Sequence, residues 1–113
     1  MELALIFKTL GDDIRLRILG LLMGGELCVC DIESVLGISQ VNVSRHLARM
    51  KSTGILTSRK NAQWVYYSVN RTFMETHPVL LDSLIVEFKK LPGNKSDMKK
   101  LAVVKRNKSE NQC

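Results

Sequence analysis

The chain has 113 residues, of which 45% are hydrophobic and 25% are charged, and its mean hydropathy is close to zero. This length accommodates one domain, and the composition is that of a globular protein rather than a disordered or fibrous one. The longest run made only of apolar residues and glycines, residues 18–25, is less than half of the ~20 apolar residues that a membrane-spanning helix needs, and the N-terminus lacks the basic region of a signal peptide. We therefore expect a cytoplasmic protein without a membrane partner.

Two helices are predicted at the start of the chain. Apolar residues at positions i, i+3, i+4 and i+7 predict a helix over residues 2–10. Asp12 and Asp13 then stand where a capping residue and a first-turn acid belong, so they begin a second helix. That helix is expected to end at the glycine pair Gly24–Gly25.

A helix-turn-helix unit is predicted next. Residues 31–36 form a short helix that ends at Gly37, and Ser39 caps a fourth helix over residues 40–52. Two helices joined by so short a turn are typical of a unit that places its second helix in the major groove of DNA.

The fourth helix has one apolar face and one polar face. Val43, Leu47 and Met50 recur at helical spacing, so they are expected to point into the core. The opposite face carries arginines, amides and hydroxyls but no acid, which is typical of major-groove readout. The residues around this helix that we predict to contact DNA are Ser39, Gln40, Val41, Asn42, Ser44, Arg45, His46 and Arg49.

Positive charge is concentrated in this part of the chain. The net charge is +6, and residues 34–74 hold six basic residues and no acidic one, whereas residues 1–33 hold three basic and six acidic residues. A segment free of carboxylates is typical of a surface that binds the phosphate backbone. We therefore expect double-stranded DNA as a partner.

A β-hairpin is predicted after the helix-turn-helix unit. Residues 55–60 and 63–69 are rich in β-branched and aromatic side chains, and Asn61–Ala62 link them. The hairpin would form a wing beside the recognition helix. Arg59 and Lys60 lie near its tip, where they are predicted to contact phosphates or the minor groove.

A last helix is predicted to open at Pro78 and to cover residues 79–91. Its apolar stripe is wider than one small domain needs, so part of it should pack on a second copy of the chain together with the first helix. The residues predicted to mediate this dimerisation are Leu3, Ile6, Phe7, Leu80, Leu81, Leu84, Ile85 and Phe88.

These elements predict a mainly α fold with a β-hairpin, an α+β winged helix-turn-helix that forms a homodimer. Residues 1–92 make up the DNA-binding and dimerisation domain. Residues 93–113 are rich in lysine, and we expect them to form a basic flexible tail that can include a short helix.

Three sequence blocks resemble the ArsR/SmtB family of metal-responsive winged-helix repressors, and in particular its arsenic-responsive members. Residues 26–32 (ELCVCDI) resemble the ELCVCDL box of that family, and residues 39–47 and 64–67 match two further blocks in the same order. The resemblance implies a homodimer that represses a resistance operon. It also implies that the protein leaves its operator when a thiophilic ion such as arsenite or antimonite binds Cys28 and Cys30.

The chain departs from the family pattern at two places. Arsenic sensors of this kind often carry a third cysteine where this chain has Glu33, so a third ligand would come from Cys113, Glu33 or solvent. Zinc-sensing relatives use an Asp-x-His pair, and the corresponding positions here are Arg71 and Phe73, so that zinc site is expected to be absent. The remaining candidate ligands are expected to act as a helix cap and as surface acids; they are His77, Asp82 and Glu87.

The spacing of the cysteine pair suggests a release mechanism. In a helix, residues i and i+2 point about 200° apart, so one ion cannot easily be held by both while the first turn stays helical. We therefore expect ion binding to distort the start of the third helix, on which the recognition helix rests. All three cysteines are expected to be thiols, because they are too few for the disulfide framework of a small secreted domain.

Other functions are compatible with the same fold. The cysteine pair can bind cadmium, lead or zinc as the inducer, or it can sense oxidants through oxidation of its thiols. A metal-independent nucleoid-type DNA-binding module is a further alternative. An enzyme is not expected, because the chain has no Cys-x-x-Cys motif beside a βαβ pattern and no nucleophile–base pair, and no organic cofactor is predicted.

Overall fold

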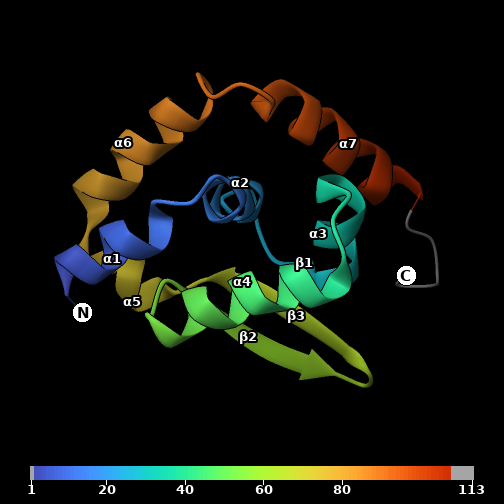
Figure 1. Cartoon of the computed structure of the whole chain (residues 1–113), viewed down its shortest axis with the longest axis horizontal. Coiled ribbons are helices and arrows are strands. Elements are labelled where there is room, and N and C mark those ends of the chain that lie inside the picture. The colour runs from blue at the N-terminus through green and yellow to red at the C-terminus, as the bar shows by residue number, and fades with distance from the viewer. Residues whose placement is uncertain (1, 108–113) are drawn as a thin grey trace.

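The computed structural model describes residues 2–107 (Figure 1). Its helices are α1 (Leu3–Leu10), α2 (Asp13–Leu22), α3 (Val29–Leu36), α4 (Gln40–Ser52), α5 (Arg71–Thr76), α6 (Pro78–Phe88) and α7 (Asn94–Asn107). The strands are β1 (Leu27–Cys28), β2 (Leu56–Asn61) and β3 (Trp64–Val69). The predicted winged helix-turn-helix is confirmed.

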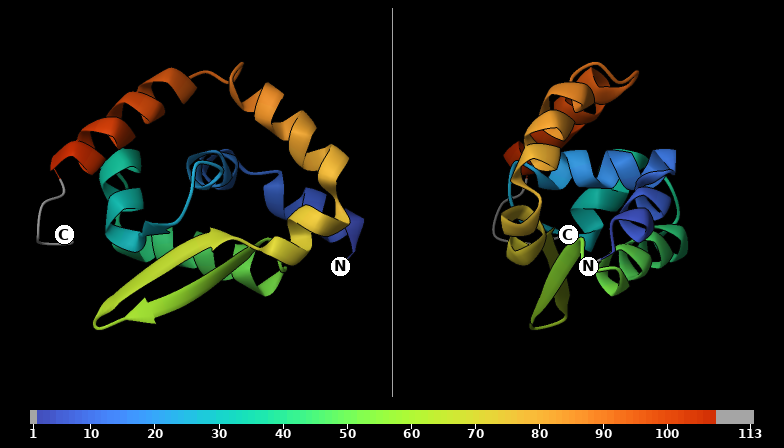
Figure 2. Two further views of the ribbon diagram at one scale, coloured as in Figure 1. Left: turned by 180° about the vertical axis from the view of Figure 1, so that it is seen from behind. Right: turned by 90° about the vertical axis from the view of Figure 1, so that its left-hand side faces the viewer.

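Helix α2 lies at the centre of the molecule. Helix α4 and the wing lie on one side of it, α3 lies beside it, and α6 and α7 arch over the other side (Figures 1 and 2). Among the described residues, no helix is both long and apolar enough to cross a membrane. The largest completely buried core side chains are Ile6, Ile18, Leu19, Ile32, Val35, Val43, Leu47, Met50, Ile55 and Phe73.

Short-range signals place the starts of α2 and α4 and the end of α3. The Asp12 carboxylate accepts from the Arg15 backbone N–H at 3.1 Å, and the Ser39 hydroxyl oxygen accepts from the Asn42 backbone N–H at 3.3 Å. Gly37 ends α3 with a φ of 68°, a conformation that favours glycine, and this turns the chain into α4. The predicted bounds of α4 are confirmed.

The sheet has three antiparallel strands in the order β1-β3-β2, one more than predicted. The β2–β3 hairpin pairs from Leu56↔Val69 to Asn61↔Trp64. Strand β1 adds Leu27↔Tyr67 and Cys28↔Tyr66 on the free edge of β3. Two residues are too short a strand for a sequence pattern to reveal, because they form it only by pairing with β3.

The segment after the wing differs from the single predicted helix. Helix α5 precedes α6, and the Asn70 side chain caps it by accepting from the Thr72 backbone N–H at 3.0 Å. Its six residues make fewer than two turns, which is too little for an apolar stripe to be recognised. Helix α6 opens at Pro78 as predicted but ends at Phe88 rather than at residue 91.

Residues 94–107 also differ from expectation, since they form the 14-residue helix α7 packed on the core rather than a flexible tail with a short helix. The helix packs on α2 and α3, with Leu101 buried. The Asp97 carboxylate accepts two hydrogen bonds of 2.9 Å from the Arg17 guanidinium of α2. This pairing raises the pKa of Arg17, and it ties the helix to a residue 80 positions earlier in the chain.

Breaking this ion pair is expected to loosen α7. The Asp97 side chain is only 6% exposed and that of Arg17 is 31% exposed, so Asp97→Asn should lower the free energy of unfolding by about 1–2 kcal/mol. Urea unfolding checks this. Glu87→Gln is the matched control, because it removes the exposed Lys90–Glu87 pair and should cost less than about 0.5 kcal/mol. Equal losses in the two variants would contradict the expectation.

Candidate DNA-binding surface and soft-ion site

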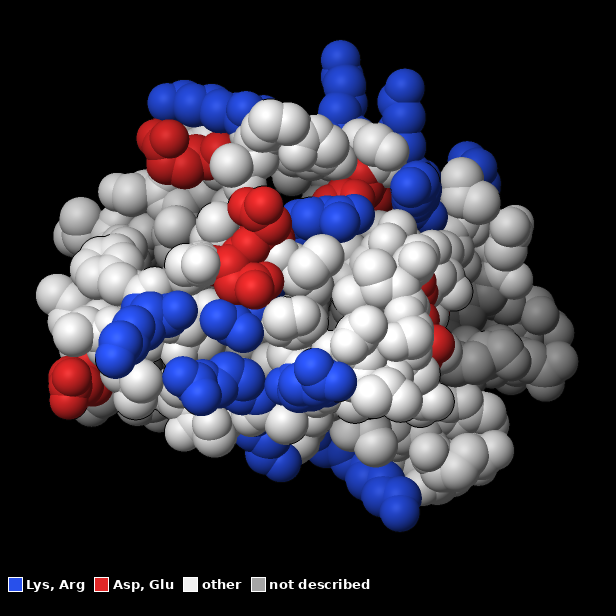
Figure 3. Space-filling view, in the orientation of Figure 1, with Lys and Arg blue, Asp and Glu red and all other residues white. Residues whose placement is uncertain are grey.

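The polar face of α4 is open to solvent. Val43, Leu47 and Met50 are completely buried, as predicted, so the other side of the helix presents exposed Arg45 and Arg49. Figure 3 shows Lys and Arg side chains in a band across the lower part of this face of the molecule, with acidic side chains directly above it. The arrangement leaves the face of α4 accessible to a DNA groove.

The other residues around α4 that are predicted to contact DNA fall into two groups, those with contacts inside the protein and those that are exposed. The Ser39 hydroxyl caps α4, and His46 is half-buried with its Nδ1 atom 3.3 Å from Nη1 of Arg15. The others are exposed around the first turns of the helix, and they are Gln40, Val41, Asn42 and Ser44. Their contacts with DNA stay a prediction.

The two basic residues of the wing have different surroundings. Lys60 is exposed near the tip of the hairpin. The Arg59 guanidinium donates to both carboxylate oxygens of Glu26, at 2.7 and 2.8 Å, and lies 4.6 Å from the centre of the Tyr66 ring. The hydrogen bond from Arg59 lowers the pKa of Glu26 below its ordinary value and outweighs the opposing effect of burial. Arg59 therefore reaches a phosphate only in competition with Glu26.

Removing that competitor is expected to strengthen DNA binding. Glu26→Gln deletes the carboxylate and leaves Arg59 free to face a phosphate, so affinity for DNA should rise by about threefold to tenfold and become more salt-dependent. Fluorescence anisotropy over a range of salt concentrations measures both quantities. Thermal unfolding serves as the control for the fold. An unchanged affinity would show that Arg59 does not contact DNA.

Cys28, Cys30 and Asp31 form a compact group at the start of α3. Cys28 is the N-cap residue and is 1% exposed, Cys30 lies in the first turn and is half-buried, and Asp31 is 4% exposed. The two sulfur atoms and a carboxylate oxygen all lie within 4.8 Å of one another. Asp31 Oδ2 also accepts from the Cys28 backbone N–H at 3.4 Å, as part of a capping box.

The expected divergence of the two cysteines is wrong. Cys28 is not helical but extended, with φ −81° and ψ 159°, so its side chain is not turned about 200° away from that of Cys30. Two metal–sulfur bonds of ~2.3 Å at a tetrahedral angle place sulfurs about 3.8 Å apart. The pair therefore needs to close by no more than about 1 Å, and the first turn of α3 need not unwind.

The oxidation states of the two cysteines differ. Cys28 is not part of a disulfide, whereas Cys30 is disulfide-bonded, so the expectation of thiols throughout is wrong for Cys30. Cys113, predicted as a third ligand, lies outside the described residues. Glu33, the alternative protein ligand, is half-buried in the next turn of α3.

An open pocket of about 350 Å³ adjoins this group. Cys30 and Glu33 line it from α3, Gln40 and Ser44 from α4, and Trp64 from the wing. The pocket gives solvent a route to Cys30. It also places Cys30 beside both parts of the molecule that are predicted to read DNA.

The residues predicted for dimerisation divide by burial. Ile6, Leu81 and Phe88 are buried within the single chain, and Leu80 and Leu84 are half-buried against its core, so these five stabilise the fold itself. The residues that remain exposed are Leu3, Phe7 and Ile85. Exposed Leu5, Val79 and Val86 extend this apolar surface, and sequence periodicity missed them because it does not show which side of a helix the core covers.

The other candidate ligands do not gather into a site. Asp82 and Glu87 are exposed, and Glu87 pairs with Lys90 at 3.2 Å. His77 links α5 to α6, and its ring lies 5.9 Å from that of Phe73. Within residues 2–107, the group of Cys28, Cys30 and Asp31 is the cluster whose ligand atoms could hold a metal ion.

The comparison with protein families gives a match over the centre of the chain. The family model described as "Bacterial regulatory protein, arsR family" matches residues 12–58. This segment includes α2, α3 and α4 and therefore both the cysteine group and the predicted recognition helix.

Individual relatives and solved structures extend this match. The arsenic resistance transcriptional regulator ArsR1 of Pseudomonas putida is 46% identical over 67 residues, which cover 58% of this chain and 52% of that protein, about half its length. An arsenical resistance operon repressor of Staphylococcus xylosus is 39% identical over 74 residues, covering 66% of this chain and 71% of the repressor. The homodimeric winged helix-turn-helix DNA-binding domain of Mb0332 from Mycobacterium bovis superimposes with a TM-score of 0.64 at 28% identity, covering 74% of this chain and 78% of that one.

Proposed function

Because this chain belongs to the arsR family of bacterial regulatory proteins, we propose that it represses an arsenic-resistance operon. It binds the operator as a homodimer and leaves it when arsenite or antimonite binds Cys28 and Cys30. The expectation of a regulatory protein rather than an enzyme is confirmed by the family membership.

The observation that carries the proposal is the position of the cysteine group. Cys28 and Cys30 bring two sulfur atoms within 4.8 Å at the start of α3, and α3 leads through Gly37 into α4. Soft ligands select soft ions such as trivalent arsenic and antimony. A soft-ion site and a DNA-reading helix are thus separated by a single short helix.

The site has enough donors for the proposed inducer in the reduced protein. Cys28 and Cys30 supply two thiolates, and a third ligand from Cys113, Glu33 or solvent completes a three-coordinate shell. Glu33 lines the same pocket as Cys30. The name of the Pseudomonas putida relative, an arsenic resistance regulator, supports arsenite as the inducer.

Cys28 is the residue through which binding reaches the DNA-reading elements. It pairs with Tyr66 of the wing strand β3, and its backbone N–H is held by the Asp31 carboxylate at the start of α3. Drawing the Cys28 and Cys30 sulfurs together by up to about 1 Å would shift Cys28 and strain both contacts, and this strain would reach the wing and the start of α3 without unwinding the helix. A coupling free energy of about 1–3 kcal/mol between inducer and DNA is the usual range for such linkage.

Dimerisation is proposed through α1 and α6. Leu3 and Phe7 on α1 and Ile85 and Val86 on α6 are large apolar side chains exposed to solvent. A second copy packed by two-fold symmetry would cover them and would present two recognition helices to a palindromic operator. The homodimeric Mb0332 domain supports this arrangement.

A second candidate function is the sensing of oxidants. The disulfide at Cys30 favours it, because the same cysteine then has two states that differ in their ability to bind a soft ion. Oxidation and arsenite would act on one site, and only the reduced protein would answer to arsenite.

The test is DNA release followed by fluorescence anisotropy on a fragment of the protein's own promoter. The reduced protein should bind the fragment and should be released by arsenite or antimonite. Cadmium, lead, zinc and peroxide form the comparison panel. Release by peroxide alone would favour the oxidant sensor. DNA binding that none of these ions and not even peroxide changes would indicate a metal-independent DNA-binding module and would contradict the proposal.

A further inference from the structure

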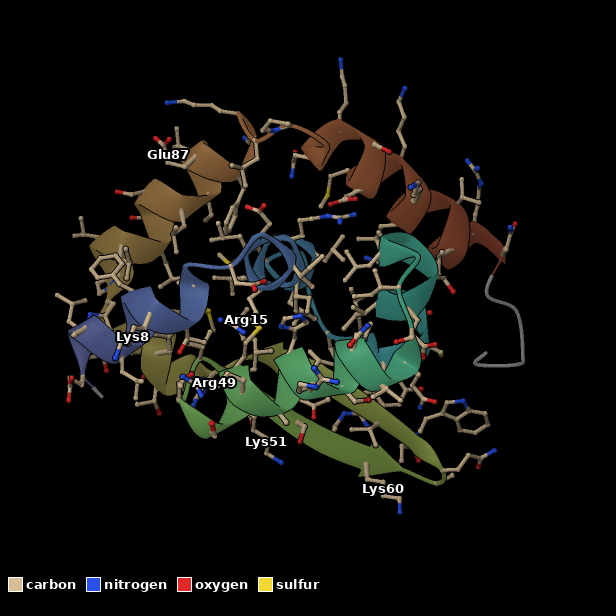
Figure 4. The ribbon with its side chains drawn as sticks, viewed as in Figure 1. Lys8, Arg15, Arg49, Lys51, Lys60 and Glu87 are labelled. Atoms are coloured by element: carbon tan, nitrogen blue, oxygen red, sulfur yellow. The ribbon has the colours of Figure 1, made fainter. Side chains whose placement is uncertain are left out.

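Basic side chains outside the helix-turn-helix continue the band of positive charge on α4. In the orientation that Figures 3 and 4 share, Lys8 comes from α1, Arg15 from the start of α2, Arg49 and Lys51 from α4, and Lys60 from the wing. The salt bridges within residues 2–107 are Arg17–Asp97, Arg59–Glu26 and Lys90–Glu87. In that part of the chain, therefore, neither Lys8 nor Arg15 has a carboxylate within 4 Å.

The Arg15 guanidinium is held in place beside α4. Its Nε atom donates to the carbonyl oxygen of Thr9 at the end of α1, and its Nη1 atom lies 3.3 Å from Nδ1 of His46. Partial burial raises the pKa of Asp12, but the hydrogen bond from the Arg15 backbone N–H and the positive charge of Arg15 outweigh this effect and lower it. A cation that is ordered before binding loses little entropy when it meets a phosphate.

The contact with Arg15 also orients the His46 ring. A guanidinium can only donate hydrogen bonds, so Nδ1 of His46 must accept, and the ring proton of the neutral imidazole then resides on Nε2. His46 lies on α4 within the predicted DNA-reading residues. Arg15 thereby fixes the Nε2–H of His46 as a hydrogen-bond donor on the recognition helix, and its own guanidinium adds a positive charge beside that helix.

We propose that α1 and the start of α2 contact DNA through Lys8 and Arg15, on the phosphates between the two half-sites of the operator. This inference rests on the proposed function, since it requires a DNA-bound dimer. Lys8 shares α1 with exposed Leu3 and Phe7, so it lies next to the proposed two-fold axis. Helix α1 lies at one end of α4, and the tip of the wing lies at the other end (Figure 1). The wing tip therefore faces the outer flank of each half-site.

The experiment measures the salt dependence of promoter binding for Lys8→Gln, Arg15→Gln and the double variant. Each phosphate contact contributes about 0.9 to the slope of log affinity against log salt, so loss of Lys8 from both protomers should reduce the slope by about 1.8. Lys99→Gln on α7 is the matched control and should leave the slope unchanged, because α7 lies on the opposite side of the molecule (Figure 1).

Hydroxyl-radical cleavage of the promoter fragment locates the contacts. The wild type should protect the spacer and both half-sites, and the double variant should lose protection in the spacer alone. Lys8→Gln changes an exposed side chain, so it keeps the inference testable if Arg15→Gln fails to fold. If the wild type binds the promoter and the Lys8 variant keeps the same salt dependence and the same protection of the spacer, only this inference is overturned. A wild type that does not bind the promoter overturns the proposed function as well.

Discussion

Replacing Cys28 or Cys30 by serine is expected to abolish the release of DNA by arsenite. A serine hydroxyl is a hard ligand, so the loss of either sulfur should weaken arsenite binding by about 100-fold or more. DNA binding without arsenite should stay within about threefold of the wild type, because serine is a favoured N-cap residue and Cys28→Ser preserves the start of α3. Ultraviolet thiolate–metalloid absorption and anisotropy on promoter DNA measure the two effects separately.

Two further variants sharpen this prediction. Cys113→Ser shows whether the third ligand is a thiolate, since it should reduce arsenite affinity only if that residue completes the shell. Ser34→Ala is the matched control, because Ser34 lies on the exposed side of α3, where its hydroxyl donates to the carbonyl oxygen of Cys30 at 3.0 Å. Arsenite release that survives in both Cys28→Ser and Cys30→Ser would exclude this pair as the inducer site.

Removing both arginines from the exposed face of α4 is expected to weaken promoter binding by about 100-fold or more. Arg45 and Arg49 are exposed, and an arginine that bridges guanine acceptors accounts for about 1–3 kcal/mol. Alanine has the highest helix propensity, so α4 should remain intact in the double variant. Anisotropy on specific and unrelated DNA fragments gives the affinity and its specificity.

The conservative double variant separates base contacts from phosphate contacts. Arg45→Lys/Arg49→Lys keeps the charge but loses the bidentate geometry, so it should bind unrelated DNA nearly as well as the wild type while losing preference for the promoter. Lys99→Ala on α7 is the control for a change of charge far from α4. Full promoter preference in the lysine variant would show that these arginines contact only the backbone.

The sequence predicted the elements whose signals lie close together in the chain. Ser39 and the 3.6-residue apolar period bounded α4, and Gly37 marked the turn before it, because caps and turns act within a few residues. The hairpin and the acid-free basic segment were likewise visible in composition. Helix α5 was missed although Asn70 caps it, since a single capping residue before six residues is a weak signal.

The cysteine group shows where sequence spacing misled. The pair was expected at or just before the start of the third helix and to diverge where that turn is helical, but Cys28 lies just outside the helix and adopts an extended conformation. Its pairing with Tyr66 in the sheet favours that conformation. Asp31 was overlooked as a member of the group because its side chain is a common first-turn acid in any helix.

The chain by itself therefore determined the helix-turn-helix, the wing, the cysteine pair and the location of the positive charge. The tertiary structure alone decided the contacts of Arg59 with Glu26, of Arg15 with His46 and of Arg17 with Asp97, whose partners are 33, 31 and 80 positions apart. Local preferences extend over a turn or two of chain, whereas such pairs form only when packing brings distant elements together. Which basic residues are free to meet DNA, and which are already held by a carboxylate, is for that reason a property of the fold.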